Sequence, residues 1–152
     1  MGDKEFMKIA IEEAKNSDGY PKVGAVIICK EKVISKGHTE MIKEGLFAHA
    51  EENAINSLSN VSGDALYVTL EPCFYRSSSH KTCCDLILNS GIKKVVIGLK
   101  DFNIKNNGNS IKKLKERGLE VLIFDKSMER ELLELLGGEY ICKHREVHHN
   151  NS

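Results

Sequence analysis

Apolar residues recur along the chain in two patterns, one helical and one extended. Where they return every three or four positions and share a stripe, we predict a helix. Where they form a short run that is rich in β-branched residues, we predict a strand. The helical pattern covers residues from about Asp3 to 15, 49–58, 83–90, 110–117 and 127–136. The extended pattern covers residues 23–29, 33–36, 65–70, 95–99 and 120–124.

The order of these elements indicates one α/β domain. The first two strands are separated by the polar turn 30–32, so they form a hairpin. The remaining strands alternate with helices, which predicts one mixed five-stranded sheet covered by helices on both faces. Residues 39–48 are expected to form a loop, and the site is expected beyond the carboxyl ends of the strands. We place the domain at residues 1–140 and a flexible C-terminal tail at residues 141–152.

The composition is that of a soluble globular protein. Of the 152 residues, 41% are hydrophobic and 29% are charged, which is typical of a folded domain. The longest apolar run, residues 23–29, is too short to span a membrane. Residues 1–8 lack the basic and apolar regions of a signal peptide. We therefore expect a cytoplasmic protein with no membrane partner.

The formal net charge is zero, but the charges are unevenly distributed. Residues 93–117 carry eight basic and two acidic groups, a surplus of six positive charges in an otherwise slightly acidic chain. The neutral total argues against a nucleic-acid partner. The local surplus, which includes Lys100 and Lys105, suits one phosphate group on a small-molecule substrate.

Three short segments carry the candidate chemistry. They contain His49 and Glu51 at the start of one predicted helix, Cys73 after a strand, and Cys83 at the start of the next helix. One imidazole and two thiolates form a three-ligand zinc set whose fourth position is open to water, as in catalytic zinc sites. The helix start favours a thiolate at Cys83. Because His49 and Glu51 are two residues apart, they can converge only at the first turn of their helix.

This residue set predicts hydrolytic deamination. Bound zinc lowers the pKa of a water molecule toward ~7, which supplies hydroxide at neutral pH. Glu51, next to the metal but not a ligand, can take the proton of that water, pass it to a ring nitrogen and later protonate the departing amine. The same zinc set with a nonligand Glu occurs in nucleobase deaminases. We therefore expect one zinc ion per chain, with His49, Cys73 and Cys83 as ligands and Glu51 as the catalytic residue.

The sequence around these residues resembles a known family. Residues 49–51 read HAE, residues 67–73 read YVTLEPC, and nine residues, 74–82, separate the two cysteines. In this respect the chain resembles the deaminase half of the bifunctional bacterial riboflavin-biosynthesis enzyme (RibD type), over roughly residues 6–136. The resemblance implies a cytidine-deaminase-like three-layer sandwich. It also implies at least a homodimer and deamination of a phosphoribosylated diaminopyrimidine.

The resemblance further implies contacts to a nucleotide-like substrate. Asp101 and Asn103 match an Asp-x-Asn pair of the family. His38 and Lys81 complete the set of candidate substrate contacts. The chain departs from the family pattern at Tyr20, which stands where the family has Asn before a proline.

Three alternatives remain open at this point. His80 would close a four-ligand structural site if it joined the three predicted ligands. The HAEENAI sequence at residues 49–55 also resembles deoxycytidylate deaminases, so the substrate alternative is deoxycytidylate or another nucleotide or nucleoside. The alternative of another class is a zinc-stabilised binding module without catalysis.

Cys84 points about 100° away from Cys83 on the same helix, so we expect it to pack in the core.

Overall fold

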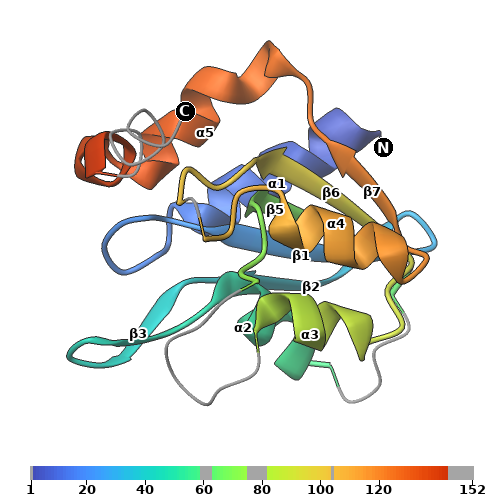
Figure 1. The fold of residues 1–152 in the computed structure, drawn as a ribbon. Helices are drawn as coiled ribbons and strands as arrows, with labels where there is room; N and C mark the ends of the chain where they lie inside the picture. Colours follow the sequence, from blue (N-terminus) through green and yellow to red (C-terminus); the bar gives the residue numbers. More distant parts are fainter. Residues whose placement is uncertain (1, 59–62, 75–81, 104, 144–152) are drawn as a thin grey trace.

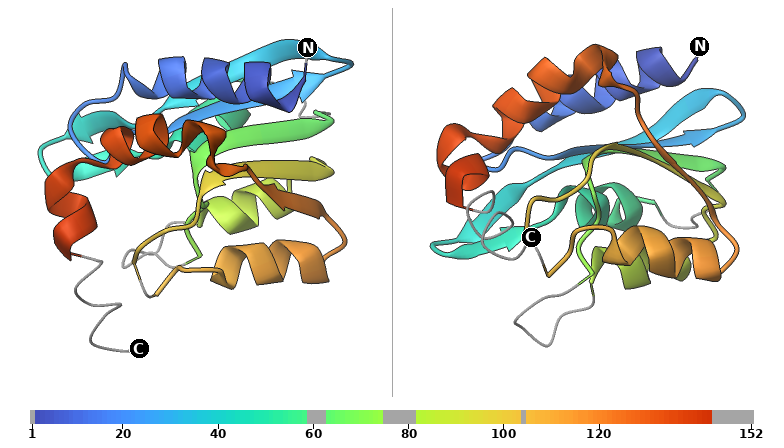
Figure 2. Two further views of the ribbon diagram at one scale, coloured as in Figure 1. Left: turned by 90° about the horizontal axis from the view of Figure 1, so that it is seen from above. Right: turned by 45° about the horizontal axis from the view of Figure 1, so that its top comes forward.

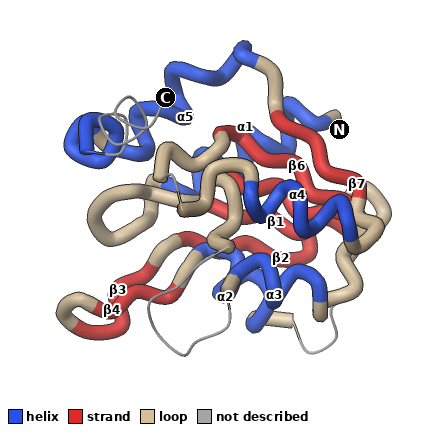
Figure 3. Tube along the Cα trace, viewed as in Figure 1, coloured by secondary structure: helices blue, strands red, loops and turns tan. Residues whose placement is uncertain are grey.

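The structure, a computed structural model, describes residues 2–58, 63–74, 82–103 and 105–143. Within these ranges the order of helices and strands follows the predicted order, apart from two additional short strands within residues 39–48 (Figures 1 and 3). The helices are α1 (Asp3–Ala14), α2 (Ala50–Asn56), α3 (Cys83–Leu88), α4 (Asn109–Glu116), the 3-10 helix η1 (Lys126–Met128) and α5 (Glu129–Leu136). The strands are β1 (Gly24–Cys29), β2 (Lys32–His38), β3 (Glu40–Lys43), β4 (Leu46–Ala48), β5 (Ala65–Leu70), β6 (Lys94–Leu99) and β7 (Glu120–Ile123).

Five strands form the mixed sheet that the sequence predicted, in the order β2-β1-β5-β6-β7. β1 runs antiparallel to both β2 and β5, whereas β5, β6 and β7 are parallel. Leu70 at the end of β5 pairs with Leu99 at the end of β6. The segments that follow these two strands therefore start side by side at the same edge of the sheet, where parallel sheets hold their sites.

Helices cover both faces of this sheet and make three layers (Figure 2). α2, α3 and α4 lie on one face, and α1 and α5 lie on the other. The sequence of β1 explains why both faces are covered. Ala25 and Ile27 point into the core beneath α2, α3 and α4, whereas Val26 and Ile28 point into the core beneath α1 and α5. Apolar side chains are thus needed on both sides of the strand, and this explains its uninterrupted apolar sequence.

The prediction of a loop over residues 39–48 was wrong. These residues form a two-stranded hairpin, β3 and β4, which projects from the body of the protein (Figure 3). All four residues of β3 are exposed, and Met41 and Ile42 are 51% and 63% exposed. The strands pair only with each other and none of their residues is fully buried, so their sequence carries no clear alternation that predicts a strand.

The chain continues beyond α5 in a second helical segment, residues 138–143. The predicted tail, residues 141–152, therefore begins within helical residues, and residues 144–152 lie outside the described part of the chain. Among the described helices, none has the length and apolar character needed to cross a lipid bilayer.

Candidate active site

The start of α2 is fixed by close packing against β2. A Cβ atom on Gly37 would lie 2.4 Å from the carbonyl oxygen of Ala50, so only glycine permits this approach. The side-chain amide of Asn53 donates a hydrogen bond of 2.8 Å to the carbonyl oxygen of His38. His49 directly precedes α2, and these contacts therefore determine where its imidazole lies.

The two predicted cysteine ligands meet where β5 ends and α3 begins. Cys83 is the first residue of α3, whose N-terminus is capped by the Thr82 hydroxyl accepting a 3.1 Å bond from the backbone N–H of Asp85. The backbone N–H of Cys83 donates to the sulfur of Cys73 over 3.1 Å. The backbone N–H of Cys84 donates to the Cys73 carbonyl oxygen over 3.2 Å. Backbone hydrogen bonds thus hold the two segments together without an ion.

The distances between the three predicted ligands fit a tetrahedral zinc ion. His49 Nδ1 lies 3.2 Å from Cys83 Sγ and 3.6 Å from Cys73 Sγ, and all three donor atoms lie within 4.8 Å of one another. Zinc bonds of about 2.0 Å to nitrogen and about 2.3 Å to sulfur place such atoms about 3.5–3.8 Å apart. In the described part of the chain no fourth His, Cys, Asp or Glu joins this group, and His80 lies outside that part.

The thiols of Cys73 and Cys83 shift each other's pKa in opposite directions. The Cys83 thiol donates to Cys73, which lowers the pKa of Cys73 to about 5. The same hydrogen bond, together with burial, raises the pKa of Cys83. In the absence of an ion, Cys73 therefore opposes the thiolate that the helix start is expected to favour at Cys83. Zinc binding would require both thiols to lose their protons, since both sulfurs bind the ion as thiolates.

Glu51 lies in the first turn of α2, beside the three candidate ligands. Its side chain is only 4% exposed. Burial raises the pKa of Glu51 to about 7, and the neighbouring His49 opposes this shift. The structure thus brings His49 and Glu51 together at the helix start, as their spacing predicts.

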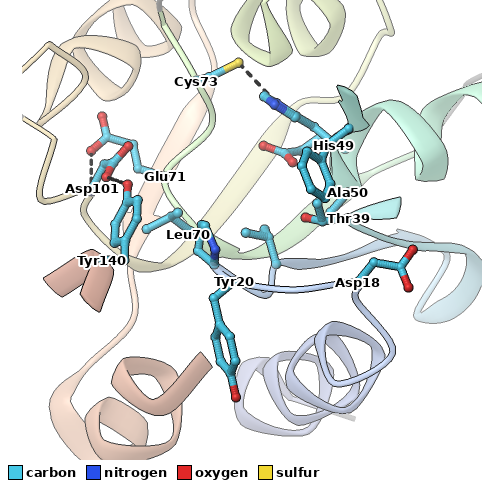
Figure 4. Close-up of a pocket in the computed structure, with 14 residues that line it drawn as sticks. Asp18, Tyr20, Thr39, His49, Ala50, Leu70, Glu71, Cys73, Asp101 and Tyr140 are labelled. Carbon is cyan, nitrogen blue, oxygen red and sulfur yellow. Dashed lines mark hydrogen bonds between the residues drawn. The ribbon is translucent and has the colours of Figure 1, made fainter. Parts of the chain in front are cut away.

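A pocket of about 240 Å³ opens beside this group (Figure 4). His49, Cys73 and Glu51 line it, whereas Cys83 is fully buried and is not part of its wall. The ligand set is therefore accessible from the pocket side. The other lining residues are Asp18, Tyr20, Pro21, Val23, Thr39, Phe47, Ala50, Leu70, Glu71, Asp101 and Tyr140.

The opposite wall of the pocket is organised by the buried carboxylate of Glu71. Its Oε1 accepts from the backbone N–H groups of Asp101 and Gly108 at 3.1 and 3.0 Å, and its Oε2 accepts from the Ser110 hydroxyl at 2.9 Å. These bonds tie the end of β5 to the segment between β6 and α4. The side-chain amide of Asn106 then donates to Asp101 Oδ2 over 3.1 Å.

The predicted substrate contacts divide into three cases. Asp101 lines the pocket, and the backbone N–H of Asn103 donates to Asp101 Oδ1 over 3.0 Å without Asn103 being part of the wall. His38 is directed elsewhere, with its Nδ1 2.5 Å from Glu13 Oε2. Lys81 lies outside the described residues. Asp101 is therefore the candidate contact that the described structure places at the pocket.

Sequence reasoning missed two residues of this wall, Glu71 and Tyr140. The signal for Glu71 was present, because an acidic residue directly follows the fully buried strand Ala65–Leu70. A buried carboxylate at such a position needs several hydrogen-bond donors. Tyr140 had no local signal, since its contact with Asp101 joins residues that are 39 positions apart.

Comparison with known proteins identifies the family. Residues 1–99 match the family described as the cytidine and deoxycytidylate deaminase zinc-binding region. The riboflavin biosynthesis protein RibD of Aquifex aeolicus is 40% identical over 124 residues, which are 78% of this chain and 34% of that protein. The chain thus spans about a third of the length of this relative. The diaminohydroxyphosphoribosylamino-pyrimidine deaminase of Buchnera aphidicola subsp. Schizaphis graminum is 35% identical over 128 residues, 81% of this chain and 84% of that protein.

Solved structures show the same fold. The diaminohydroxyphosphoribosylaminopyrimidine deaminase/5-amino-6-(5-phosphoribosylamino)uracil reductase of Thermotoga maritima has a TM-score of 0.73 and 36% identity, over 88% of this chain and 38% of that chain. The Rib2 deaminase of Aspergillus oryzae, in complex with DARIPP, has a TM-score of 0.70 and 22% identity, over 87% of this chain and 88% of that chain. The chain belongs to the cytidine and deoxycytidylate deaminase zinc-binding family and is similar to the deaminase domains of RibD proteins.

Proposed function

We propose that this protein is a zinc-dependent hydrolytic deaminase of the phosphoribosylated diaminopyrimidine in riboflavin biosynthesis. One observation carries the proposal: a buried nonligand carboxylate, Glu51, shares a pocket with two of three side chains spaced to hold zinc. The two relatives from Buchnera aphidicola that are named as diaminohydroxyphosphoribosylamino-pyrimidine deaminases support this substrate. We further propose that the protein acts in the cytoplasm as a homo-oligomer.

The side chains of the pocket suit the steps of such a reaction. His49, Cys73 and Cys83 would hold the zinc ion, which would supply a water molecule acidic enough to lose a proton near neutral pH. Glu51 accepts this proton and donates it to the ring nitrogen next to the carbon under attack. Glu51 then takes the proton of the hydroxyl now on that carbon and passes it to the exocyclic amine, so that the carbon–nitrogen bond breaks, a carbonyl forms and ammonia leaves. The net change is that the carbon gains the oxygen of water and loses nitrogen as ammonia.

The charge of the pocket suits a base that carries several amino groups. Asp18, Glu71 and Asp101 contribute carboxylates to the lining, and no lysine or arginine is among the described lining residues. Carboxylates accept hydrogen bonds from amines. We propose Asp101 as the substrate contact on this wall, while Asn103 acts through Asp101. The roles of His38 and of Lys81, a candidate for the phosphate group, remain predictions.

The test is ammonia release by the zinc-loaded protein from a panel of substrates. We expect release from the phosphoribosylated diaminopyrimidine with a kcat/KM at least about 100-fold above that for deoxycytidylate, because a site built for hydrogen bonds discriminates strongly against a substrate that leaves them unpaired. A preference for deoxycytidylate would assign the protein to the alternative substrate. Full zinc occupancy without ammonia from any pyrimidine nucleotide would instead indicate a binding module.

A further inference from the structure

The turn that joins α5 to the helical segment 138–143 is held against the loop that precedes β1. The backbone N–H of Lys22 donates to the carbonyl oxygen of Leu135 over 2.7 Å. Gly137 turns the chain with a φ of +82°, a value that favours glycine. A Cβ atom there would lie 2.9 Å from Cδ1 of Tyr20, so the ring of Tyr20 packs directly on this turn. The segment is thus anchored at its start, next to the pocket.

This anchoring brings Tyr140 into the wall of the pocket. Its hydroxyl donates a hydrogen bond to Oδ1 of Asp101, whereas the hydroxyl of Tyr20 points away from that carboxylate (Figure 4). Tyr140 and Asp101 both line the pocket. Burial and the neighbouring carboxylate raise the pKa of Tyr140, which favours the protonated form of the hydroxyl that donates this bond.

The hydrogen bonds of Asp101 define which of its acceptor positions is free. Oδ1 accepts from the Tyr140 hydroxyl and from the backbone N–H of Asn103, which uses both of its lone pairs. Oδ2 accepts from the side-chain amide of Asn106. Among the described residues no second donor is recorded at Oδ2, so one acceptor position remains there. Since Tyr140 and Asn106 bind opposite oxygens, together they fix the rotation of the carboxylate.

We propose that Tyr140 is a positioning residue of the active site, which holds the Asp101 carboxylate in the orientation that receives an amino group of the substrate. The C-terminal helical segment is then part of the binding site. This inference rests on the proposed function, because it assigns Asp101 to the substrate of that reaction. Tyr140 acts on binding rather than on the chemical step, since His49 lies on the other side of the pocket from Tyr140 and Asp101 (Figure 4).

The test is the kinetic effect of Tyr140→Phe, which removes only the hydroxyl. We expect KM to rise about tenfold, the size expected for one hydrogen bond to a charged group, while kcat stays within about twofold. The matched control is Tyr67→Phe, because the Tyr67 hydroxyl also donates to a carboxylate, that of Asp3, but on the other face of the sheet. This control should lower Tm and leave KM unchanged. Zinc content should equal that of the parent in both variants.

Three results would overturn the inference. An unchanged KM for Tyr140→Phe would show that the hydroxyl does not position Asp101. An equal rise in KM for Tyr67→Phe would show that a general loss of stability is responsible. A fall in kcat together with zinc content would place Tyr140 in the support of the metal ligands. In each of these cases the parent protein still deaminates the diaminopyrimidine, whereas an inactive zinc-loaded parent would reject the proposed function itself.

Discussion

The metal side of the pocket and its opposite wall are built on different principles. On the metal side, His49, Cys73 and Cys83 place three donor atoms together at distances that suit an ion. On the opposite wall, the carboxylates of Glu71 and Asp101 already accept hydrogen bonds from the chain itself. The metal side therefore needs an ion to complete it, whereas the wall is held in place by hydrogen bonds of the folded chain itself. Changes on the metal side should remove chemistry, and changes in the wall should weaken binding and stability.

The largest effect is expected from Cys83→Ser. Loss of even an outer-shell partner lowers metal affinity 10–100-fold, so removal of a ligand should lower zinc affinity by more than about 100-fold and abolish ammonia release. The matched control is Cys84→Ser, since Cys84 is equally buried but packs in the core, as predicted. It should lower Tm while retaining zinc. Zinc content by atomic absorption separates the two outcomes, and equal zinc loss in both variants would contradict the assignment of Cys83.

The next effect is expected from Glu51→Gln, which keeps the shape of the side chain but removes its ability to carry a proton. The rate of deamination should fall by about 10²–10⁴-fold, with zinc still bound, because general acid–base catalysis contributes on this order. Glu52→Gln is the matched control, since Glu52 is the neighbouring acid and does not line the pocket. Single-turnover ammonia release measures the chemical step. Retention of the parental rate by Glu51→Gln would disprove the mechanism.

A smaller effect is expected from Glu71→Ala in the opposite wall. The substitution leaves the backbone N–H groups of Asp101 and Gly108 and the Ser110 hydroxyl without their acceptor, which should reduce the free energy of unfolding by about 2–4 kcal/mol. KM should rise several-fold because Asp101 is less well held, and zinc content should not change. Glu71→Gln, which keeps one carbonyl oxygen, should cost less than Glu71→Ala. Denaturant unfolding of both variants measures the difference in stability. Loss of zinc without a change in KM would show that Glu71 supports the metal side and not the opposite wall.

The smallest effect is expected from loss of an ion pair between α3, which carries Cys83, and α4, which follows the opposite wall. Asp85 on α3 accepts a 2.9 Å bond from Lys113 on α4, and this bond lowers the pKa of Asp85 below its ordinary value of 3.8. Because the pKa of Asp85 is lower in the folded than in the unfolded protein, its charged form stabilises the folded state at pH values above 3.8. This stabilisation is lost as the pH falls through the pKa of the folded protein. Both side chains are partly exposed, so Asp85→Asn should cost less than about 1 kcal/mol at pH 7.

A thermal unfolding series of the metal-free protein tests this pair. The difference in Tm between the parent and Asp85→Asn should shrink between pH 7 and pH 3. Lys113→Met should produce a similar change at pH 7, and the double variant should add little to either single variant. A difference that grows as the pH falls would show that the pair does not link α3 to α4 in the way described.

The sequence predicted the fold where burial imposes a pattern. Strand β5 was predicted over its full range, Ala65–Leu70, because all six of its residues are buried. The β3–β4 hairpin was missed because its first strand is exposed on both sides. The periodicity of apolar residues in a sequence reflects which faces of an element are buried. A strand with no buried face therefore has no periodic pattern by which it could be predicted.

The same distinction applies to the site. The metal side could be predicted because imidazole and thiol groups at helix starts have few roles that fit their chemistry as well as zinc binding does. Glu71 and Tyr140 are residue types with many structural uses. Their roles come from hydrogen bonds between Glu71 and Asp101, 30 positions apart, and between Tyr140 and Asp101, 39 positions apart. Only the folded chain brings these partners together.

The most direct test of the central claim is a zinc titration of the metal-free protein, with ammonia release from the phosphoribosylated diaminopyrimidine followed at each step. The account predicts that activity rises linearly with added zinc and stops at about one equivalent per chain, as three ligands for a single ion require. Full activity before any zinc is added, or one bound equivalent without ammonia release, would contradict it.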